Sequence, residues 1–142
     1  MTFSWSISLI LSWCAYVCIV VLFLWKGGNI QAATNGAIFP WFYPPGWVFG
    51  LVWTLLFVLF LVILAYSSDS QRIVGLVYYT LVLAWTPLFV YTKRYDLAFY
   101  YLLFILGCTI GFAIYIQSWY FVPQIIWITC ATGLALSMFI LN

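Results

Sequence analysis

The sequence has almost no charged side chains. Of its 142 residues, 4% are Asp, Glu, Lys or Arg and 68% are hydrophobic, whereas a soluble domain carries about 25% charged residues. This composition excludes a water-soluble domain and predicts an integral membrane protein in contact with lipid. Because the whole chain holds only four basic residues, a nucleic-acid partner is not expected.

The side chains that carry chemistry inside membranes are also missing from the apolar runs. The sequence has no histidine, and its two acids and four basic residues lie at or near the ends of those runs. Proton relays, ion pumps and voltage sensors need ionisable groups within the bilayer, and a retinal-type Schiff base needs a buried lysine. These functions are excluded, and we expect no catalytic residue, metal site or cofactor.

Cysteine is present, but not in a metal-binding pattern. Cys14, Cys18, Cys108 and Cys130 all fall inside apolar runs. Cys14 and Cys18 share a helix face and could present two thiolates to a metal. No C-x-x-C pair or histidine completes a tetrahedral set, and buried cysteine usually behaves as a small hydrophobe. Structural packing is the expected role.

Long apolar runs, by contrast, are abundant. A hydrocarbon core of about 30 Å is crossed by about 20 apolar residues in a helix. We therefore predict an all-α, polytopic membrane protein, a five-helix transmembrane bundle that forms a single domain over residues 1–142. No basic segment precedes the first run, so it is expected to be retained rather than cleaved as a signal peptide. The predicted spans are residues 5–25, 45–66, 73–92, 97–116 and 123–141.

The connections predict how the helices begin. Pro45 suits the first helical position, where no intrahelical hydrogen bond is lost. Only KRYD, residues 93–96, separates the third run from the fourth, which predicts a tight helical hairpin. The Asp96 side chain is expected to cap the fourth helix and to face the positive end of its dipole.

An odd number of spans places the two termini on opposite sides of the membrane. Lys26, Lys93 and Arg94 then lie on one side, and Asp69 and Arg72 lie on the other. By the positive-inside bias, the C-terminal side is predicted to face the cytosol. The protein is expected in a bacterial or organellar membrane.

Two G-x-x-x-G pairs occur within the runs, Gly46 with Gly50 and Gly107 with Gly111. Glycines at this spacing allow helices to approach closely. Contacts inside the bundle are the expected use, and contacts between subunits are the alternative.

Aromatic residues make up 23% of the chain, and Trp53, Trp85 and Trp127 lie deep in three different runs. Hydrocarbon cannot satisfy an indole N–H, so each should face a polar partner or a cavity. The stretch FPWFYPPGWVFGLVW, residues 39–53, predicts a rigid lid and helix entry. Phe49 and Trp53 should share one face of the second helix and wall a cavity, with core packing as the alternative.

Three spaced motifs connect these residues. The first is P-x-W-x-P-P-x-x-x-F-x-x-x-W-x-x-L-Y, and its matching residues are Pro40, Pro44, Pro45, Phe49, Trp53 and Leu56. Phe42 replaces the first Trp of this pattern, and Phe57 replaces the final Tyr. The third run has W-x-P-x-F at Trp85, Pro87 and Phe89. The fifth run meets P-x-x-x-W-x-x-x-A-T-x-L with Pro123, Trp127, Ala131, Thr132 and Leu134.

These motifs resemble those of the TspO, or translocator protein, family of five-helix membrane proteins, also called tryptophan-rich sensory proteins. The chain departs from the family at three polar positions: Val82 and Ala135 stand where Asn is common, and Tyr101 stands where an acid is common. The aromatic and basic C-terminal segment proposed for cholesterol contact is also absent.

The resemblance implies that a hydrophobic planar ligand binds between the second, third and fifth helices, with transport, sensing or regulation as the outcome. A porphyrin, sterol, carotenoid or lipid would suit such a pocket, and the lost polar residues favour the more apolar of these. It also implies a homodimer. The implied ligand-binding residues are Pro44, Phe49, Trp53, Trp85, Tyr101, Trp127, Ala131 and Leu134.

Two other interpretations remain open. An accessory subunit of a larger membrane complex would keep the fold without the ligand site, and the scarcity of charge fits this role. An enzyme acting on a tetrapyrrole is the weakest alternative, because no acid, base or metal ligand lines the spans.

Overall fold

The computed structural model describes residues 5–27 and 34–142, with side chains described for 7–19, 34–45 and 47–142. All regular structure in this part of the chain is helical, which confirms the predicted fold class. The elements are α1 (Trp5–Gly27), α3 (Gly46–Ala65), α4 (Asp69–Leu83), α5 (Trp85–Thr92), α6 (Tyr95–Ile116), the 3₁₀ turn η1 (Trp119–Phe121) and α7 (Val122–Leu141).

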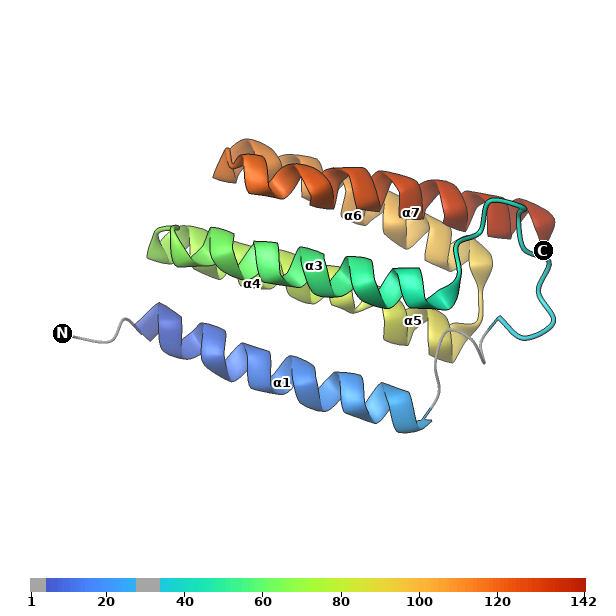
Figure 1. The fold of residues 1–142 in the computed structure, drawn as a ribbon, viewed down its shortest axis with the longest axis horizontal. Coiled ribbons are helices and arrows are strands. Elements are labelled where there is room, and N and C mark those ends of the chain that lie inside the picture. The colour runs from blue at the N-terminus through green and yellow to red at the C-terminus, as the bar shows by residue number, and fades with distance from the viewer. Residues whose placement is uncertain (1–4, 28–33) are drawn as a thin grey trace.

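The helices lie nearly side by side in an elongated bundle (Figure 1). Helices α6 and α7 form one layer, α3 and α4 form the next, and α1 lies beyond them, while α5 continues the line of α4. The α3–α4 turn and η1 lie at one end, which we call the turn end. The end of α1, the α5–α6 connection and the C-terminus lie at the other, the loop end.

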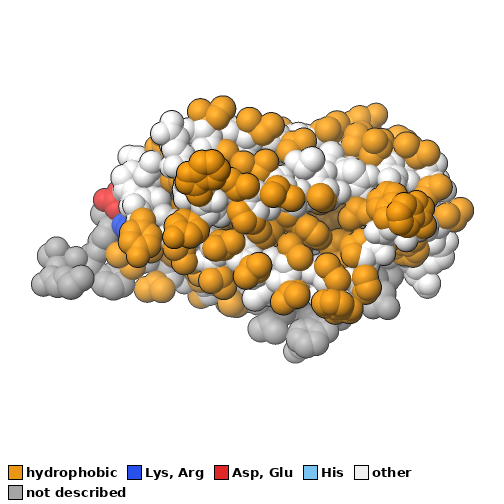
Figure 2. All heavy atoms as spheres, turned by 45° about the horizontal axis from the view of Figure 1, so that its top comes forward, with side chains coloured by type: hydrophobic (Ala, Val, Ile, Leu, Met, Phe, Trp, Pro, Cys, Tyr) orange, Lys and Arg blue, Asp and Glu red, His pale blue; other side chains and the backbone are white. Residues whose placement is uncertain are grey.

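Lengths and composition identify the membrane-spanning parts. The stretches Trp47–Ala65, Asp69–Thr92, Tyr95–Ile116 and Trp119–Leu141 are long and apolar enough to cross a membrane, and α1 adds a helix of 23 residues. Hydrophobic side chains cover much of the face shown in Figure 2, and the charged atoms visible there gather at one end. The charges follow the predicted division. Lys93 and the backbone of Lys26 lie at the loop end, and the Lys26 side chain is outside the described part. Arg72 lies at the turn end.

The third span differs from its prediction in two ways. It begins at Asp69 rather than residue 73 because Ser68 and Gln71 form a capping box, which extends the helix into the polar connection. It is also interrupted at Ala84, between α4 and α5. Pro87 has no backbone N–H to donate to the carbonyl one turn earlier, so one helical hydrogen bond is missing. Its ring also crowds the residues of that preceding turn. The break therefore has a local cause in the sequence.

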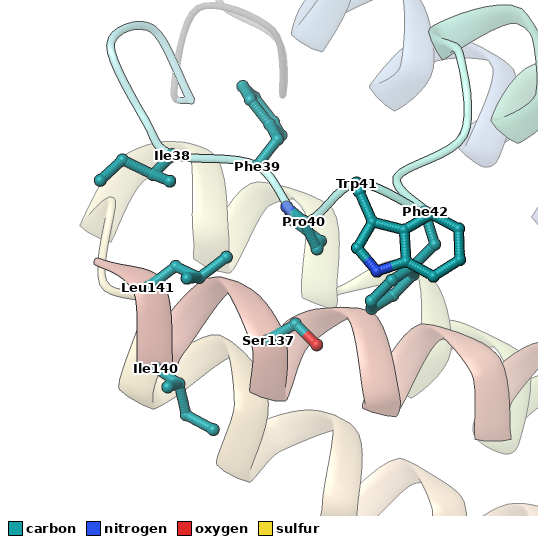
Figure 3. Close-up of a pocket in the computed structure, with 8 residues that line it drawn as sticks. All are labelled: Ile38, Phe39, Pro40, Trp41, Phe42, Ser137, Ile140 and Leu141. Atoms are coloured by element: carbon teal, nitrogen blue, oxygen red, sulfur yellow. The ribbon is translucent and has the colours of Figure 1, made fainter.

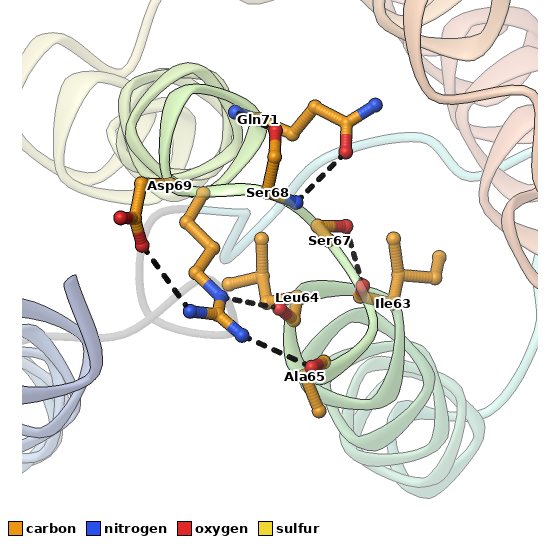
Figure 4. Close-up of polar contacts among 8 residues, drawn as sticks. Ile63, Leu64, Ala65, Ser67, Ser68, Asp69 and Gln71 are labelled. Carbon is orange, nitrogen blue, oxygen red and sulfur yellow. Dashed lines mark hydrogen bonds and ion pairs between the residues drawn. The ribbon is translucent and has the colours of Figure 1, made fainter. Parts of the chain in front are cut away.

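The α3–α4 turn is held by a dense set of hydrogen bonds (Figure 4). Arg72 donates from Nε to the Leu64 carbonyl at 2.8 Å and from Nη2 to the Ala65 carbonyl at 3.0 Å. Its Nη1 lies 3.4 Å from the Asp69 carboxylate, and the Ser67 hydroxyl donates to the carbonyl one turn earlier in α3. A cation thus covers carbonyls at the negative end of the α3 dipole, which have no partner within their own helix.

Asp96 does not cap α6 as predicted. The N-cap is Arg94, with no side-chain cap hydrogen bond, and Asp96 lies inside the first turn. Lys93 ends α5 in the left-handed conformation at φ 52°, so α6 starts two residues earlier than expected. The Asp96 carboxylate accepts from Arg94 at 2.7 and 3.3 Å. Because Asp96 lies in the first turn of α6, it still faces the positive end of the helix dipole, as predicted. The tight hairpin itself is confirmed.

The expected internal use of the glycine pairs is wrong for the three glycines that the structure describes. A Cβ added to Gly50, Gly107 or Gly111 would meet nothing within 4 Å, so these glycines face outward. The close approach occurs at Gly75, where a Cβ would lie 2.8 Å from Leu64 Cδ2. Glycine at position 75 lets α3, α4 and α6 come together.

The cysteines are only partly consistent with core packing. Cys14 and Cys108 are half-buried, but Cys18 and Cys130 are exposed. The last two therefore lie on the surface that meets lipid.

The best-packed region surrounds Gly75 and is built from stacked aromatic rings. Tyr78 and Phe112 stack with 5.2 Å between ring centroids and 7° between planes, and Phe121 meets Phe112 edge-on at 5.1 Å. Tyr78, Phe112 and Phe121 are all buried. We refer to Gly75, Tyr78, Thr109, Phe112 and Phe121 as the turn-side core.

Candidate functional site

Three of the eight predicted site residues meet in one group, which we call the aromatic wall: Phe49, Trp53 and Trp127. The Trp127 ring lies 5.7 Å from Phe49 at an interplanar angle of 72°, and 6.2 Å from Trp53 at 87°. All three side chains are half-buried. The rings meet edge to face, and they join α3 to α7.

The proline-rich connection positions this wall. Tyr43 donates its backbone N–H to the Pro40 carbonyl in a turn, and its ring contacts Phe49 at 5.5 Å. Pro44 is half-buried, and Pro45 is the N-cap of α3 rather than its first residue. Burial, with a smaller contribution from Tyr95, raises the pKa of the Tyr43 hydroxyl above its usual value, so this ring stays neutral.

The indole of Trp127 is left without a hydrogen-bond partner. Its Nε1 is buried and has no acceptor among the described residues. Gln124 Oε1, which can only accept, and the Tyr79 hydroxyl are also buried and have no hydrogen-bond partner among the described residues. Unpaired buried polar atoms are rare because each loses its hydrogen bonds to water, so these three atoms are unusual features of the interior.

Trp85 and Tyr101 lie apart from the aromatic wall and already have partners. Trp85 donates from Nε1 to the Ala98 carbonyl at 3.1 Å and stacks on Phe89 at 5.4 Å. The Tyr101 hydroxyl donates to the Leu81 carbonyl. Both residues hold the span formed by α4 and α5 against α6, and the expectation that the Trp85 indole faces a polar partner is confirmed.

The remaining predicted site residues lie on α7 beyond Trp127. Ala131 and Leu134 are half-buried, about one and two turns further along the helix. The positions without the usual family polar residue, Val82 and Ala135, are both buried.

A buried polar cluster was missed from the sequence. Gln124 Nε2 lies 3.4 Å from the Tyr78 hydroxyl, which lies 2.7 Å from the Thr109 hydroxyl. Only 3% of Gln124 is exposed. The interior of the bundle is thus more polar than predicted, and the single amide at the start of the fifth apolar run was the available signal.

The contact that holds α1 was missed as well. Trp13 donates from Nε1 to the Thr80 hydroxyl at 2.8 Å. Its ring packs on Phe57 and Tyr79, each 6.0 Å away. Like Trp85, this indole meets the expectation that a tryptophan within a span faces a polar partner.

A groove of about 390 Å³ lies at the loop end (Figure 3). The connection before α3 covers the end of α7 there, with Phe39 directed away from the helix. Asn142 fastens this connection, since its Oδ1 accepts from the Ile38 N–H at 2.9 Å and its Nδ2 donates to the Ile38 carbonyl at 3.0 Å. The lining residues are Ile38, Phe39, Pro40, Trp41, Phe42, Ser137, Ile140 and Leu141.

A second cavity, of about 180 Å³, lies at the turn end and is lined in part by Ser67, Gln71 and Ser118. Neither cavity includes a residue of the aromatic wall.

Fold and surface together define a polytopic helical membrane protein with an aromatic interior. The TspO/MBR family model matches residues 10–141, and the chain belongs to this family. It is also similar to a tryptophan-rich sensory protein of Cereibacter sphaeroides, with 35% identity over 116 residues and 72% of each chain covered.

Proposed function

We propose that this chain binds a planar, apolar molecule within the helix bundle and acts as a membrane sensor or carrier. The aromatic wall is the main support: Phe49, Trp53 and Trp127 meet by edges, are half-buried and include an indole N–H with no partner. Aromatic walls with few polar groups suit flat hydrophobic ligands. The similarity to a protein named as sensory supports the same role.

Shape and stacking, rather than charge, give the affinity. The described ion pairs, Arg72 with Asp69 and Arg94 with Asp96, lie outside the wall at the ends of helices. A ligand carboxylate buried beside the wall would find no cation among the described side chains there and would cost several kcal/mol. We therefore expect carotenoids or sterols to bind more tightly than anionic porphyrins.

The experiment is titration of the purified protein with a carotenoid, a sterol and a porphyrin, followed by quenching of tryptophan fluorescence. Trp53→Ala removes a wall side chain and should weaken binding of the preferred ligand by about a hundredfold, or roughly 3 kcal/mol. The control is Trp47→Ala on the same helix, because Trp47 is 71% exposed and should leave binding unchanged. Tight porphyrin binding that is equal in the wild type and in Trp53→Ala would contradict the proposal.

A role as an accessory subunit is the second candidate, and the outward-facing glycines favour it. Gly107 and Gly111 leave a flat strip on α6 with nothing within 4 Å of an added Cβ, where a second helix could pack closely. A second copy of this chain, as in a homodimer, or a different subunit would fit this strip. Purification separates the candidates, because an accessory subunit requires its partner complex and binds none of the three ligands.

We further propose that the loop end faces the cytosol, because Lys93 and Arg94 lie there. Cysteines introduced at Lys93 and Asp69 should react from opposite sides of intact vesicles. Labelling of the Lys93 position from outside would reverse this orientation.

A further inference from the structure

The polar cluster between α4, α6 and α7 forms a chain of hydrogen bonds with a fixed direction. The Thr109 hydroxyl donates to the Ile105 carbonyl at 2.7 Å. Its only hydrogen is then used, so it accepts from the Tyr78 hydroxyl. The Tyr78 oxygen in turn accepts from Gln124 Nε2. The amide must therefore turn its nitrogen toward Tyr78, which leaves Gln124 Oε1 at the free end of the chain.

This free oxygen is an acceptor that lacks a donor. Gln124 is 97% buried, given its 3% exposure, and Oε1 has no partner among the described residues. Trp127 lies three residues further along α7, so the two side chains are neighbours on the helix surface. Its buried Nε1 is a donor that lacks an acceptor. Gln124 and Trp127, which carry this unpaired acceptor and this unpaired donor, are thus one turn apart on α7, and Trp127 belongs to the aromatic wall.

Few chemical groups satisfy both atoms at once. A hydroxyl donates one hydrogen bond and accepts another. An aldehyde can only accept, so it would serve Trp127 and leave Gln124 Oε1 unpaired. A carboxylate would place a negative charge against the amide oxygen, and a hydrocarbon would leave both atoms unpaired.

We propose that the apolar ligand carries a neutral hydroxyl group that binds between Gln124 Oε1 and Trp127 Nε1, with its hydrocarbon body against Phe49 and Trp53. The inference rests on the proposed function and deepens it, because it names the polar group that the site selects. Neither of the two cavities described above includes Gln124, so a ligand that reaches it through the wall would have to turn the wall rings aside. Trp127 makes edge contacts and its indole nitrogen makes no hydrogen bond among the described residues that would hold it in place.

Retinol, retinal and retinoate test this selection, because they share one flat polyene and differ in the terminal group. Binding is measured in detergent by tryptophan quenching and, for retinol, by its own emission. The wild-type protein should bind retinol about tenfold more tightly than retinal, which corresponds to one hydrogen bond to a buried acceptor. Retinoate should bind most weakly.

Two substitutions separate the two hydrogen bonds. Gln124→Met removes the acceptor and should lower retinol affinity about tenfold while leaving retinal affinity unchanged. Trp127→Phe keeps a ring but removes the donor, so it should weaken retinol and retinal alike. Thr132→Val is the matched control on α7, because the Thr132 hydroxyl already donates to the Ile128 carbonyl; retinol should remain preferred over retinal there.

The comparison of the three retinoids uses only the wild-type protein, so it tests the proposal even if a variant fails to fold. Equal affinity for retinol and retinal would overturn the hydroxyl site and would mean that water satisfies these atoms, while the proposed function would stand because the polyene still binds. Failure of all three retinoids, together with the carotenoid and the sterol, would overturn both. A retinol preference that survives Gln124→Met would place the hydroxyl elsewhere.

Discussion

The turn-side core and the aromatic wall are both made of aromatic rings, yet they are packed differently. In the turn-side core, Tyr78 and Phe112 stack almost parallel over Gly75, and the Tyr78 hydroxyl has hydrogen-bond partners. In the wall the rings meet at steep angles, the side chains are half-buried, and the Trp127 indole has no partner among the described residues. Ring content alone therefore does not distinguish the two regions; they differ in burial and in whether the polar atom of the central ring, Tyr78 or Trp127, has a partner among the described residues.

The difference implies a division of work between the two regions. A close-packed core loses free energy when any atom is removed, because its neighbours cannot collapse into the space. A wall built from edge contacts can rearrange at lower cost. Stability should depend on the turn-side core, and ligand binding on the wall.

The largest expected effect is the loss of a ring from the turn-side core. Phe112→Ala should lower the free energy of unfolding by about 3–5 kcal/mol, measured by denaturant titration in detergent. Phe49→Ala on the wall is the matched change and should lose no more than about half as much, since Phe49 is half-buried. Equal losses at the two positions would remove the distinction between core and wall.

Removal of the guanidinium at the turn end should have the next largest effect. Arg72→Met removes the guanidinium hydrogen bonds to the Leu64 and Ala65 carbonyls, although the Leu64 carbonyl still accepts from the Ser67 N–H at 3.2 Å. The change should cost about 1.5–3 kcal/mol, as expected for hydrogen bonds to a charged group. Asp69→Asn is the control, and it should cost less than about 1 kcal/mol because this carboxylate is largely exposed. A larger loss from Asp69→Asn would mean that the ion pair, not the helix cap, stabilises the turn.

A single added methyl group should distinguish the two kinds of glycine. Gly75→Ala places a carbon 2.8 Å from Leu64 Cδ2 and 3.3 Å from the Phe112 ring, both of buried residues, and should cost about 1–3 kcal/mol. Gly111→Ala meets no atom within 4 Å and should be neutral or stabilise the monomer by about 0.5–1 kcal/mol. Thermal unfolding in detergent gives both values, and a neutral Gly75→Ala would show that Leu64 can move aside.

The smallest expected effect concerns α1. Thr80→Val removes the acceptor of the Trp13 indole and should cost about 0.6–1 kcal/mol. Thr80→Ser keeps the hydroxyl and should behave like the wild type. Hydrogen exchange in α1 reports the change locally, and equal protection in both variants would mean that the ring contacts alone hold the helix.

The fold could be predicted because its main signal is local. Each span shows itself as an apolar run, and the aromatic motifs were sufficient to indicate the family. The earlier start of the third span is also indicated by neighbouring residues, the Ser68 and Gln71 pair. Its interruption is indicated by Pro87. These features could have been recognised from the sequence with closer attention to capping and helix-breaking residues.

The site was predicted less completely because its contacts join distant parts of the chain. Phe49, Trp53 and Trp127 were candidates because they lie in motifs, and the structure shows that their rings meet. Tyr78 and Gln124 are 46 positions apart, and nothing local shows that an amide in one span lies against a phenol in another. The role of Gly75 likewise depends on which helices surround it, whereas Gly107 and Gly111 fit a motif but face outward.

The hydrogen bond between Trp13 and Thr80 also has a consequence for the order of synthesis. The two residues are 67 positions apart, and a ribosome adding about 5–20 residues per second needs roughly 3–13 s to pass from one to the other. During that interval α1 is already made, but the hydroxyl that accepts from its indole is not. The first helix must therefore wait in the membrane or the insertion machinery without the native acceptor of its indole N–H, and a slower ribosome would lengthen the period in which a chaperone or a foreign helix could pair with it.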